Sequence, residues 1–174
     1  QESSFPISSQ DAASTETAQR IADRIQDTGV SIGVSESLTS GLLASFLGAA
    51  PSSSDWFLGG LTAYATSVKR SVLGVTAEAV VSEKSAAQMA EGTAKLLGAD
   101  LALGITGSGG PEPQDGREPG TVFIGITTAG QEQPDVVEQF FEGDPEEVIH
   151  ATVGTALELL DERLEKLLAE RGGR

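Results

Sequence analysis

Residues 30–48 read VSIGVSESLTSGLLASFLG, and this stretch decides the fold. Residues 30–35 form a short run with β-branched side chains, which predicts a strand. Residues 39–47 then have the composition of a helix, which Gly48 ends. A strand that passes directly into a helix is the building unit of α/β proteins. We therefore expect an α/β fold whose first strand gives way to a helix at Glu36–Thr39.

The same alternation continues along the chain. Periodicity predicts further helices over residues 14–28, 67–73, 82–97 and 145–171, and further strands over 59–65, 100–106, 121–128 and 135–142. The third strand is apolar enough to be buried on both faces. The last two strands predict a hairpin around Ala129–Gly130. The sequence therefore predicts a layered α/β fold with a mixed sheet.

Length and composition bound the domain and its class. The 174 residues suffice for one hydrophobic core, and 39% hydrophobic with 21% charged residues is the balance of a globular domain. Residues 1–13 are expected to form a disordered N-terminal tail without a secretory signal, and residues 14–171 the domain. No apolar run approaches the roughly 20 residues that span a bilayer, which excludes a membrane protein.

Charge and rare residue types narrow the chemistry. A formal net charge of −15 repels phosphate backbones, so nucleic acid is not an expected partner. The lack of Cys excludes disulfides, Cys–zinc sites and a thiol nucleophile, and it favours a cytoplasmic setting. His150 is the only His, which nearly closes off serine triads and most catalytic zinc sites. A hydrolase would then use a Lys, a carboxylate or a bound water as its base.

Three segments follow predicted strands, at the sheet edge where ligands of open α/β folds collect. They are residues 36–40, 64–69 and 106–117. Ser37 lies at the passage from strand to helix, where free N–H groups of a first helical turn stabilise a bound anion or a developing oxyanion. The alternative, which is commoner in proteins, makes Ser37 or Thr39 a helix N-cap and Glu36 a surface carboxylate.

Tyr64 and Lys69 form the second candidate group. Tyr64 is the only Tyr and ends a predicted strand, and Lys69 follows across a turn. A Lys that is partly desolvated beside Ser37 would have its pKa lowered and could take the hydroxyl proton. Tyr64 could relay that proton or orient a substrate. The alternative is a strand-end aromatic ring and a solvated helix Lys.

The segment 106–117 is rich in Gly and Pro and has no periodicity. It lacks the spacing of a P-loop and of a dinucleotide-binding loop. Its glycines allow close backbone approach to a ligand, and Arg117 could pair with an anionic group. His150, on the last helix, is interpreted as structural or solvent-facing. The apolar stripe of that helix could pack on the sheet or on a second copy, so monomer and homodimer both stay open.

Several short motifs occur in order along the chain. They are VSESLTSG at 34–41, GLTAY at 60–64 with Lys69, LGV at 73–75, ITGSGGP at 105–111 and REPGTV at 117–122. Taken together they resemble the CinA C-terminal domain, a family that includes nicotinamide mononucleotide (NMN) deamidases. The resemblance extends from about Ala18 to Leu168, and the chain looks like the stand-alone form of the family.

The resemblance implies a three-layer α/β/α fold with a mixed, mostly parallel sheet. It also implies hydrolysis of the NMN carboxamide to nicotinate mononucleotide and ammonia, without metal or cofactor. By their motifs, Ser37 resembles the nucleophile, Lys69 its base and Tyr64 their partner. The substrate-binding residues that it implies are Glu36, Thr39, Thr106, Gly107, Gly109, Gly110 and Arg117. Ser37 would form an acyl-enzyme, with the oxyanion held by N–H groups of the following helix.

The chain also departs from the family pattern. Leu38 stands where the family usually has Cys, Ser40 where it has Gly, and Thr66 where it has Asn. Basic residues that many members carry are replaced by Pro145, Ile149 and His150. If those basic residues serve the substrate phosphate, this chain binds NMN weakly or prefers a related amide. The alternative function is a catalytically inactive domain that binds a nucleotide or a protein partner.

Overall fold

The computed structural model describes residues 9–172, over which helices and strands alternate as the sequence predicts. In chain order the elements are α1 (Ser9–Ile25), β1 (Ile32–Glu36), α2 (Leu42–Ala49), the short 3-10 helix η1 (Ser53–Asp55), β2 (Phe57–Thr62), α3 (Thr66–Leu73), α4 (Glu83–Leu97), β3 (Leu101–Gly107), β4 (Thr121–Thr128), β5 (Asp135–Phe140) and α5 (Pro145–Gly172). None of these helices is long and apolar enough to cross a membrane.

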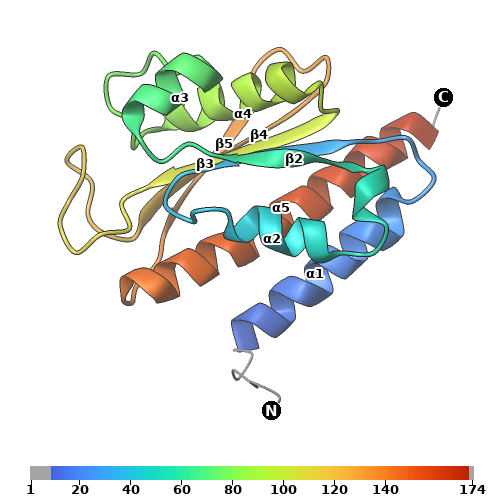
Figure 1. Cartoon of the computed structure of the whole chain (residues 1–174), viewed down its shortest axis with the longest axis horizontal. Helices are drawn as coiled ribbons and strands as arrows, with labels where there is room; N and C mark the ends of the chain where they lie inside the picture. The colour runs from blue at the N-terminus through green and yellow to red at the C-terminus, as the bar shows by residue number, and fades with distance from the viewer. Residues whose placement is uncertain (1–8, 173–174) are drawn as a thin grey trace.

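The five strands form one mixed sheet in the order β2-β1-β3-β4-β5. β1 pairs in parallel with both β2 and β3, and β4 runs antiparallel to both β3 and β5. All strands except β4 therefore point the same way. Helices α3 and α4 cover one face, and α1, α2 and α5 cover the other (Figure 1). The predicted three-layer α/β/α fold and the hairpin between the last two strands are both confirmed.

The main hydrophobic core lies between the sheet and the layer of α1, α2 and α5. Alternate residues of β3, from Leu101 to Ile105, enter this core, and every residue of the strand is buried. The apolar stripe of α5 packs into the same core through residues such as Leu157 and Leu160. The expected burial of β3 on both faces is confirmed, and the stripe of α5 is satisfied within this chain.

Helix α4 lies unusually close to the sheet because two glycines face it. Gly104 of β3 and Gly125 of β4 are direct partners in the antiparallel ladder. A Cβ atom added at Gly104 would lie 2.6 Å from the Cβ of Met89, and one at Gly125 would overlap the Ala86 carbonyl. The pair therefore forms a smooth patch on which the helix backbone rests.

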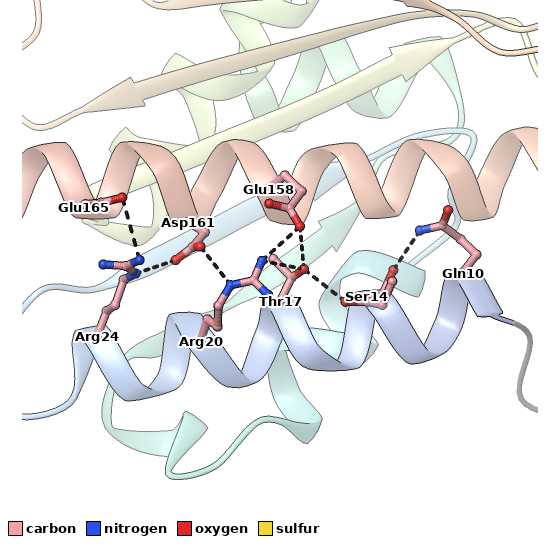
Figure 2. A network of polar contacts seen from close by, with 9 residues as sticks. Gln10, Ser14, Thr17, Arg20, Arg24, Glu158, Asp161 and Glu165 are labelled. Atoms are coloured by element: carbon pink, nitrogen blue, oxygen red, sulfur yellow. Dashed lines mark hydrogen bonds and ion pairs between the residues drawn. The ribbon is translucent and has the colours of Figure 1, made fainter.

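Helices α1 and α5 are joined along their outer side by a polar seam (Figure 2). Asp161 accepts hydrogen bonds from Arg20 at 3.3 Å and from Arg24 at 2.9 Å. Glu158 accepts a further bond from Arg20 at 3.0 Å, and Glu165 lies 3.7 Å from Arg24. We call this group the α1–α5 seam.

His150 of α5 also faces α1, where its Nδ1 lies 2.7 Å from Asp11 Oδ1. The interpretation of His150 as a structural residue therefore agrees with its position. Because α1 begins at Ser9, residues 9–13 belong to this helix, and their assignment to a disordered tail is wrong. The rest of the predicted tail, residues 1–8, lies outside the described residues.

The observed bounds differ from prediction in one place that matters for the site. The helix expected over 39–47 begins at Leu42, after a tight turn over 38–41. Ser40 and Gly41 both adopt left-handed conformations there, with φ of 51° and 97°. Hydrogen bonds from Ser40 N to Ser37 O and from Leu42 N to Thr39 O, both 3.0 Å, hold the turn. Strand β1 and α2 are therefore separated by five residues, 37–41, rather than joined directly.

Candidate active site

The topology of the sheet opens a crevice at the carboxyl end of β1. The chain leaves β1 toward α2 on one face of the sheet, and it leaves the neighbouring β2 toward α3 on the other face. Connections that diverge from adjacent strands in this way leave room for a ligand between them. Ser37 follows β1, Tyr64 and Lys69 follow β2, and Thr106 is the last residue but one of β3. The predicted convergence of the three segments is confirmed.

A pocket of about 380 Å³ occupies this crevice, a volume that suits a small ligand. The predicted site residues that line it are Ser37, Tyr64, Lys69, Thr106, Gly107, Gly109 and Gly110. Residues that were not predicted also line it, namely Leu38, Val81, Pro111, Gln114, Pro145 and Ile149. Glu36, Thr39 and Arg117 do not line it.

Ser37 and Lys69 are both buried at the pocket, with 8% and 3% of their surfaces exposed. Burial lowers the pKa of Lys69, and the negative charge of Asp115 opposes this effect. The Lys69 ammonium donates a hydrogen bond to the carbonyl oxygen of Tyr64 at 3.0 Å. Within residues 9–172 no hydrogen bond joins Lys69 to the Ser37 hydroxyl. The pair thus combines a buried hydroxyl with an amine that loses its proton more readily than a solvated lysine.

Tyr64 contributes to the site mainly through its backbone. Its carbonyl oxygen receives the Lys69 ammonium, whereas 68% of the residue is exposed. Tyr64 is also one of the residues that line the pocket. Its geometry therefore suits contact with a ligand better than proton relay between Ser37 and Lys69.

Glu36 is buried behind the pocket, with 1% of its surface exposed. Its carboxylate accepts hydrogen bonds from the Thr39 hydroxyl at 2.6 Å and from the backbone N–H groups of Leu43 and Ala44 at 2.9 and 3.0 Å. A carboxylate at this position satisfies the free N–H groups of the first turn of α2 and is favoured by the helix dipole. Glu36 therefore supports the turn that carries Ser37.

This arrangement corrects several expectations from the sequence. Glu36 is not a surface carboxylate, and Glu36 and Thr39 use their side chains on each other rather than on the pocket. Because Glu36 occupies the first-turn N–H groups of α2, those groups are not free to hold an oxyanion. The alternative, in which Ser37 or Thr39 is the helix N-cap, is also wrong. The N-cap of α2 is Gly41, which has no side chain that could cap the helix.

The segment after β3 contains a small hairpin that the sequence analysis missed. Gln114 and Arg117 form an antiparallel bridge, with N-to-O distances of 3.1 and 2.9 Å. Asp115 and Gly116 form its two-residue tip with φ of 51° and 73°. Two successive residues with positive φ, and the Asp–Gly sequence, are the marks of a tight hairpin turn. The Asp–Gly pair was the available signal for it.

The hairpin places its charged residues differently from prediction. Asp115 Oδ2 accepts a hydrogen bond from Val81 N at 3.0 Å. Arg117 lies over the ring of Phe123, 5.1 Å from its centroid, and 3.8 Å from Glu138. The guanidinium is therefore engaged away from the pocket, and the expectation that Arg117 binds a substrate anion is not supported by its position.

Two further polar side chains belong to this segment, of which Thr106 lines the pocket and Ser108 does not. The Thr106 hydroxyl donates a hydrogen bond to the Val80 carbonyl at 2.7 Å. Ser108 is completely buried, and its hydroxyl has no hydrogen-bond partner among residues 9–172. A buried polar group without a partner is destabilising, so such groups concentrate at functional positions.

The opposite wall of the pocket is apolar. Pro145 and Ile149, from the start of α5, line it, whereas His150 faces α1. Among the described lining residues, Lys69 is the only one with a positive charge. Residues 9–172 also contain no group of three or more His, Asp or Glu side chains placed to hold a metal ion.

Fold and site together define a three-layer α/β/α domain with a serine and a buried lysine in a pocket at the end of its parallel strands. Residues 14–164 match the family described as the CinA C-terminal domain, and the chain belongs to this family.

Solved structures and curated proteins with similar sequences carry CinA names. A CinA superfamily protein from Klebsiella pneumoniae is 33% identical, with a TM-score of 0.82 over 88% of this chain and 98% of that chain. A competence-damage inducible protein of Bacillus velezensis is 38% identical over 68% of this chain and 30% of its own length. A CinA-like protein of Frankia casuarinae is 46% identical over 55% of this chain and 23% of its own length. The chain thus spans about a third or less of these curated relatives.

Proposed function

We propose that this domain is an amidohydrolase that cleaves a linear carboxamide through Ser37 and Lys69. The observation that carries the proposal is the burial of both side chains at one pocket, together with the lowered pKa of Lys69. A lysine with a lowered pKa gives up its proton more readily than a solvated lysine, and its neutral form can act as a general base. Serine activated by lysine is an established variant of nucleophilic acyl transfer.

The proposed reaction proceeds in two steps. Neutral Lys69 takes the hydroxyl proton of Ser37 as its oxygen attacks the amide carbon, and the tetrahedral oxyanion forms. The C–N bond then breaks, Lys69 returns the proton to the leaving nitrogen, and ammonia departs from an ester of Ser37. In the second step Lys69 takes a proton from water, the resulting hydroxide attacks the ester, and the proton returns to the Ser37 oxygen. The product is the carboxylic acid.

The oxyanion needs backbone donors other than those at the start of α2. The N–H groups of Leu38 and Thr39 lie directly after Ser37 and donate to no other group within residues 9–172. Preorganised N–H groups of this kind typically lower the barrier of acyl transfer by about 3 kcal/mol each. We assign the oxyanion to this turn, whose left-handed Ser40–Gly41 conformation fixes the positions of both N–H groups.

The substrate we propose is NMN or a related pyridine carboxamide. Family membership and the pocket volume of about 380 Å³ support this class. The apolar Pro145–Ile149 wall and the single lining cation make the site a poor match for a phosphate group. We therefore expect the protein to release ammonia from nicotinamide riboside or nicotinamide at least as fast as from NMN.

A second candidate function is ligand binding without turnover. The missing hydrogen bond between the hydroxyl of Ser37 and the ammonium of Lys69 favours it. Calorimetric binding of NMN without ammonia release would support this alternative.

The decisive experiment measures ammonia release from NMN, nicotinamide riboside and nicotinamide by the wild-type protein and by Ser37→Ala. We expect Ser37→Ala to lower kcat by at least about 10³-fold, because the nucleophile is removed. Ser45→Ala, an exposed serine of α2, is the matched control and should retain full activity. Equal rates in Ser37→Ala and wild type would overturn the assignment of the nucleophile.

A further inference from the structure

Two side chains hold the hairpin 114–117 to the body of the domain: Arg117 lies over Phe123, and Asp115 bonds to Val81 on the side of the pocket. Asp115 occupies its tip in a left-handed conformation, with φ of 51°. Its Oδ2 accepts the N–H of Val81 at 3.0 Å, across 34 residues of sequence. Val81 and Gln114 both line the pocket, so this bond joins two of its walls.

The same carboxylate acts on Lys69 through space. No ion pair within 4.0 Å joins the two side chains among residues 9–172, yet the charge of Asp115 raises the pKa of Lys69 against the effect of burial. Two groups act on the Lys69 ammonium. They are the Tyr64 carbonyl, from the segment before α3, and the Asp115 carboxylate, from the hairpin. From the other described elements around the pocket, including α4 and α5, no charged group has a comparable effect on this ammonium.

We propose that Asp115 is a positioning residue of the active site that links the hairpin 114–117 to Val81 and places a negative charge near Lys69. Bound to Val81, its carboxylate holds Gln114 at the pocket and favours the ammonium form of Lys69. The importance of this link for catalysis rests on the proposed amidohydrolase function, whereas the link itself does not.

Asp115→Asn separates the two roles of the carboxylate. Asn tolerates the left-handed conformation and offers a carbonyl oxygen to Val81, so the anchor is kept while the charge is lost. Asp115→Ala loses both. Asp55→Asn, an exposed residue of η1 at the opposite end of β2, removes one negative charge far from Lys69 and is the matched control.

The direct test is the titration of Lys69 by NMR with ¹³C-labelled lysine, which needs no turnover. The chain has four lysines, at 69, 84, 95 and 166, and the Lys69→Arg variant assigns the signal. We expect the titration midpoint of Lys69 to move to lower pH in Asp115→Asn and to stay at the wild-type value in Asp55→Asn. A midpoint in Asp115→Asn equal to that of wild type would overturn the proposal, even if no amide proves to be a substrate.

Steady-state kinetics test the hydrogen bond between Asp115 and Val81. We expect the acidic limb of kcat/KM to move to lower pH in Asp115→Asn, with KM within about twofold of wild type because the hydrogen bond is kept. In Asp115→Ala, KM should rise by about threefold to tenfold, the equivalent of one lost hydrogen bond. An unchanged KM in Asp115→Ala would refute the role of Asp115 in holding the pocket wall.

Discussion

The α1–α5 seam and the pocket use polar side chains in opposite ways. In the seam, Asp161 accepts from two arginines and nearly every charge drawn in Figure 2 has an opposite charge beside it. In the pocket, Lys69 is more deeply buried than any residue of the seam, yet it has one hydrogen bond. The buried hydroxyl of Ser108, which is next in sequence to the lining residues Gly107 and Gly109, has no partner among the described residues. Fully paired charges at a surface hold helices together. Buried polar groups with unused hydrogen-bonding capacity lower stability, and proteins keep such groups at functional sites.

The largest effect should come from removing the amine at the pocket. Lys69→Met keeps the length of the side chain and its apolar stem but removes the general base. We expect kcat for ammonia release to fall by about 10²- to 10⁴-fold. The measurement is the rate of ammonia release from whichever of NMN, nicotinamide riboside and nicotinamide the wild-type protein hydrolyses fastest. A rate within threefold of wild type would mean that another group takes the proton of Ser37.

Stability provides the control for this variant. Because burial lowers the pKa of Lys69 in the folded protein, the unfolded chain binds the proton more tightly. The wild-type free energy of unfolding should therefore rise with pH through the folded pKa toward the ordinary lysine value of 10.5. Lys69→Met should lack this slope and be at least as stable as wild type at pH 7. A pH slope equal to that of wild type would place the titrating group elsewhere.

Glu36 combines features of both regions. It is buried, as Lys69 is, although it lies behind the pocket, and its carboxylate is fully hydrogen-bonded, as the charges of the seam are paired. Glu36→Ala leaves one hydroxyl and two backbone N–H groups without their acceptor, and should lower the free energy of unfolding by about 3 kcal/mol. Glu36→Gln keeps the shape and one acceptor oxygen and should lose about half as much. Urea denaturation measures both. A loss below about 1 kcal/mol in Glu36→Ala would show that water replaces the carboxylate easily.

The seam should respond more weakly than Glu36. Asp161→Ala removes the acceptor of two guanidinium groups at the protein surface and should lower the free energy of unfolding by about 1–2 kcal/mol. Glu165→Ala removes a more exposed partner at 3.7 Å and should change it by less than about 0.5 kcal/mol. Equal losses in the two variants would contradict the central place of Asp161.

The smallest effect is expected at the turn after Ser37. Ser40 has a left-handed φ of 51°, which Gly adopts more readily than Ser. Ser40→Gly should raise the free energy of unfolding by about 0.5 kcal/mol, because relief of strain exceeds the added freedom of the unfolded chain. Ser45→Gly, the same change inside α2, should lower it by about 0.5–1 kcal/mol. Thermal unfolding of both proteins gives the comparison, and the same sign in both would contradict the role of backbone strain.

The fold could be predicted because its signals are local. Apolar periodicity located each helix and strand, and the rule that ligands meet the carboxyl ends of parallel strands brought Ser37, Lys69 and Thr106 to one pocket. The resemblance to the CinA family assigned Ser37 and Lys69 their roles before their burial was known. Those roles and the reaction itself stay predictions until they are measured.

The wrong or missed assignments at the site share a physical cause. Each depends on backbone geometry or on contacts between residues far apart in the sequence, which short sequence patterns do not show. Glu36 was misread because the left-handed Ser40–Gly41 turn displaces the start of α2, so that the carboxylate reaches the first-turn N–H groups. Asp115 was overlooked because its partner Val81 is distant in sequence. Arg117 was assigned to the pocket because nothing local shows that it stacks on Phe123.

The glycine pair beneath α4 constrains how this domain can diverge. Every single substitution of Gly104 or Gly125 adds at least one carbon atom where the helix backbone already lies in contact. No conservative intermediate exists at either position, so a substitution of either glycine must also displace α4 from the sheet. Substitutions are then more easily accepted in the loops around the sheet and α4, including the hairpin 114–117. The two glycines are thus constrained by packing alone, because neither of them lines the pocket.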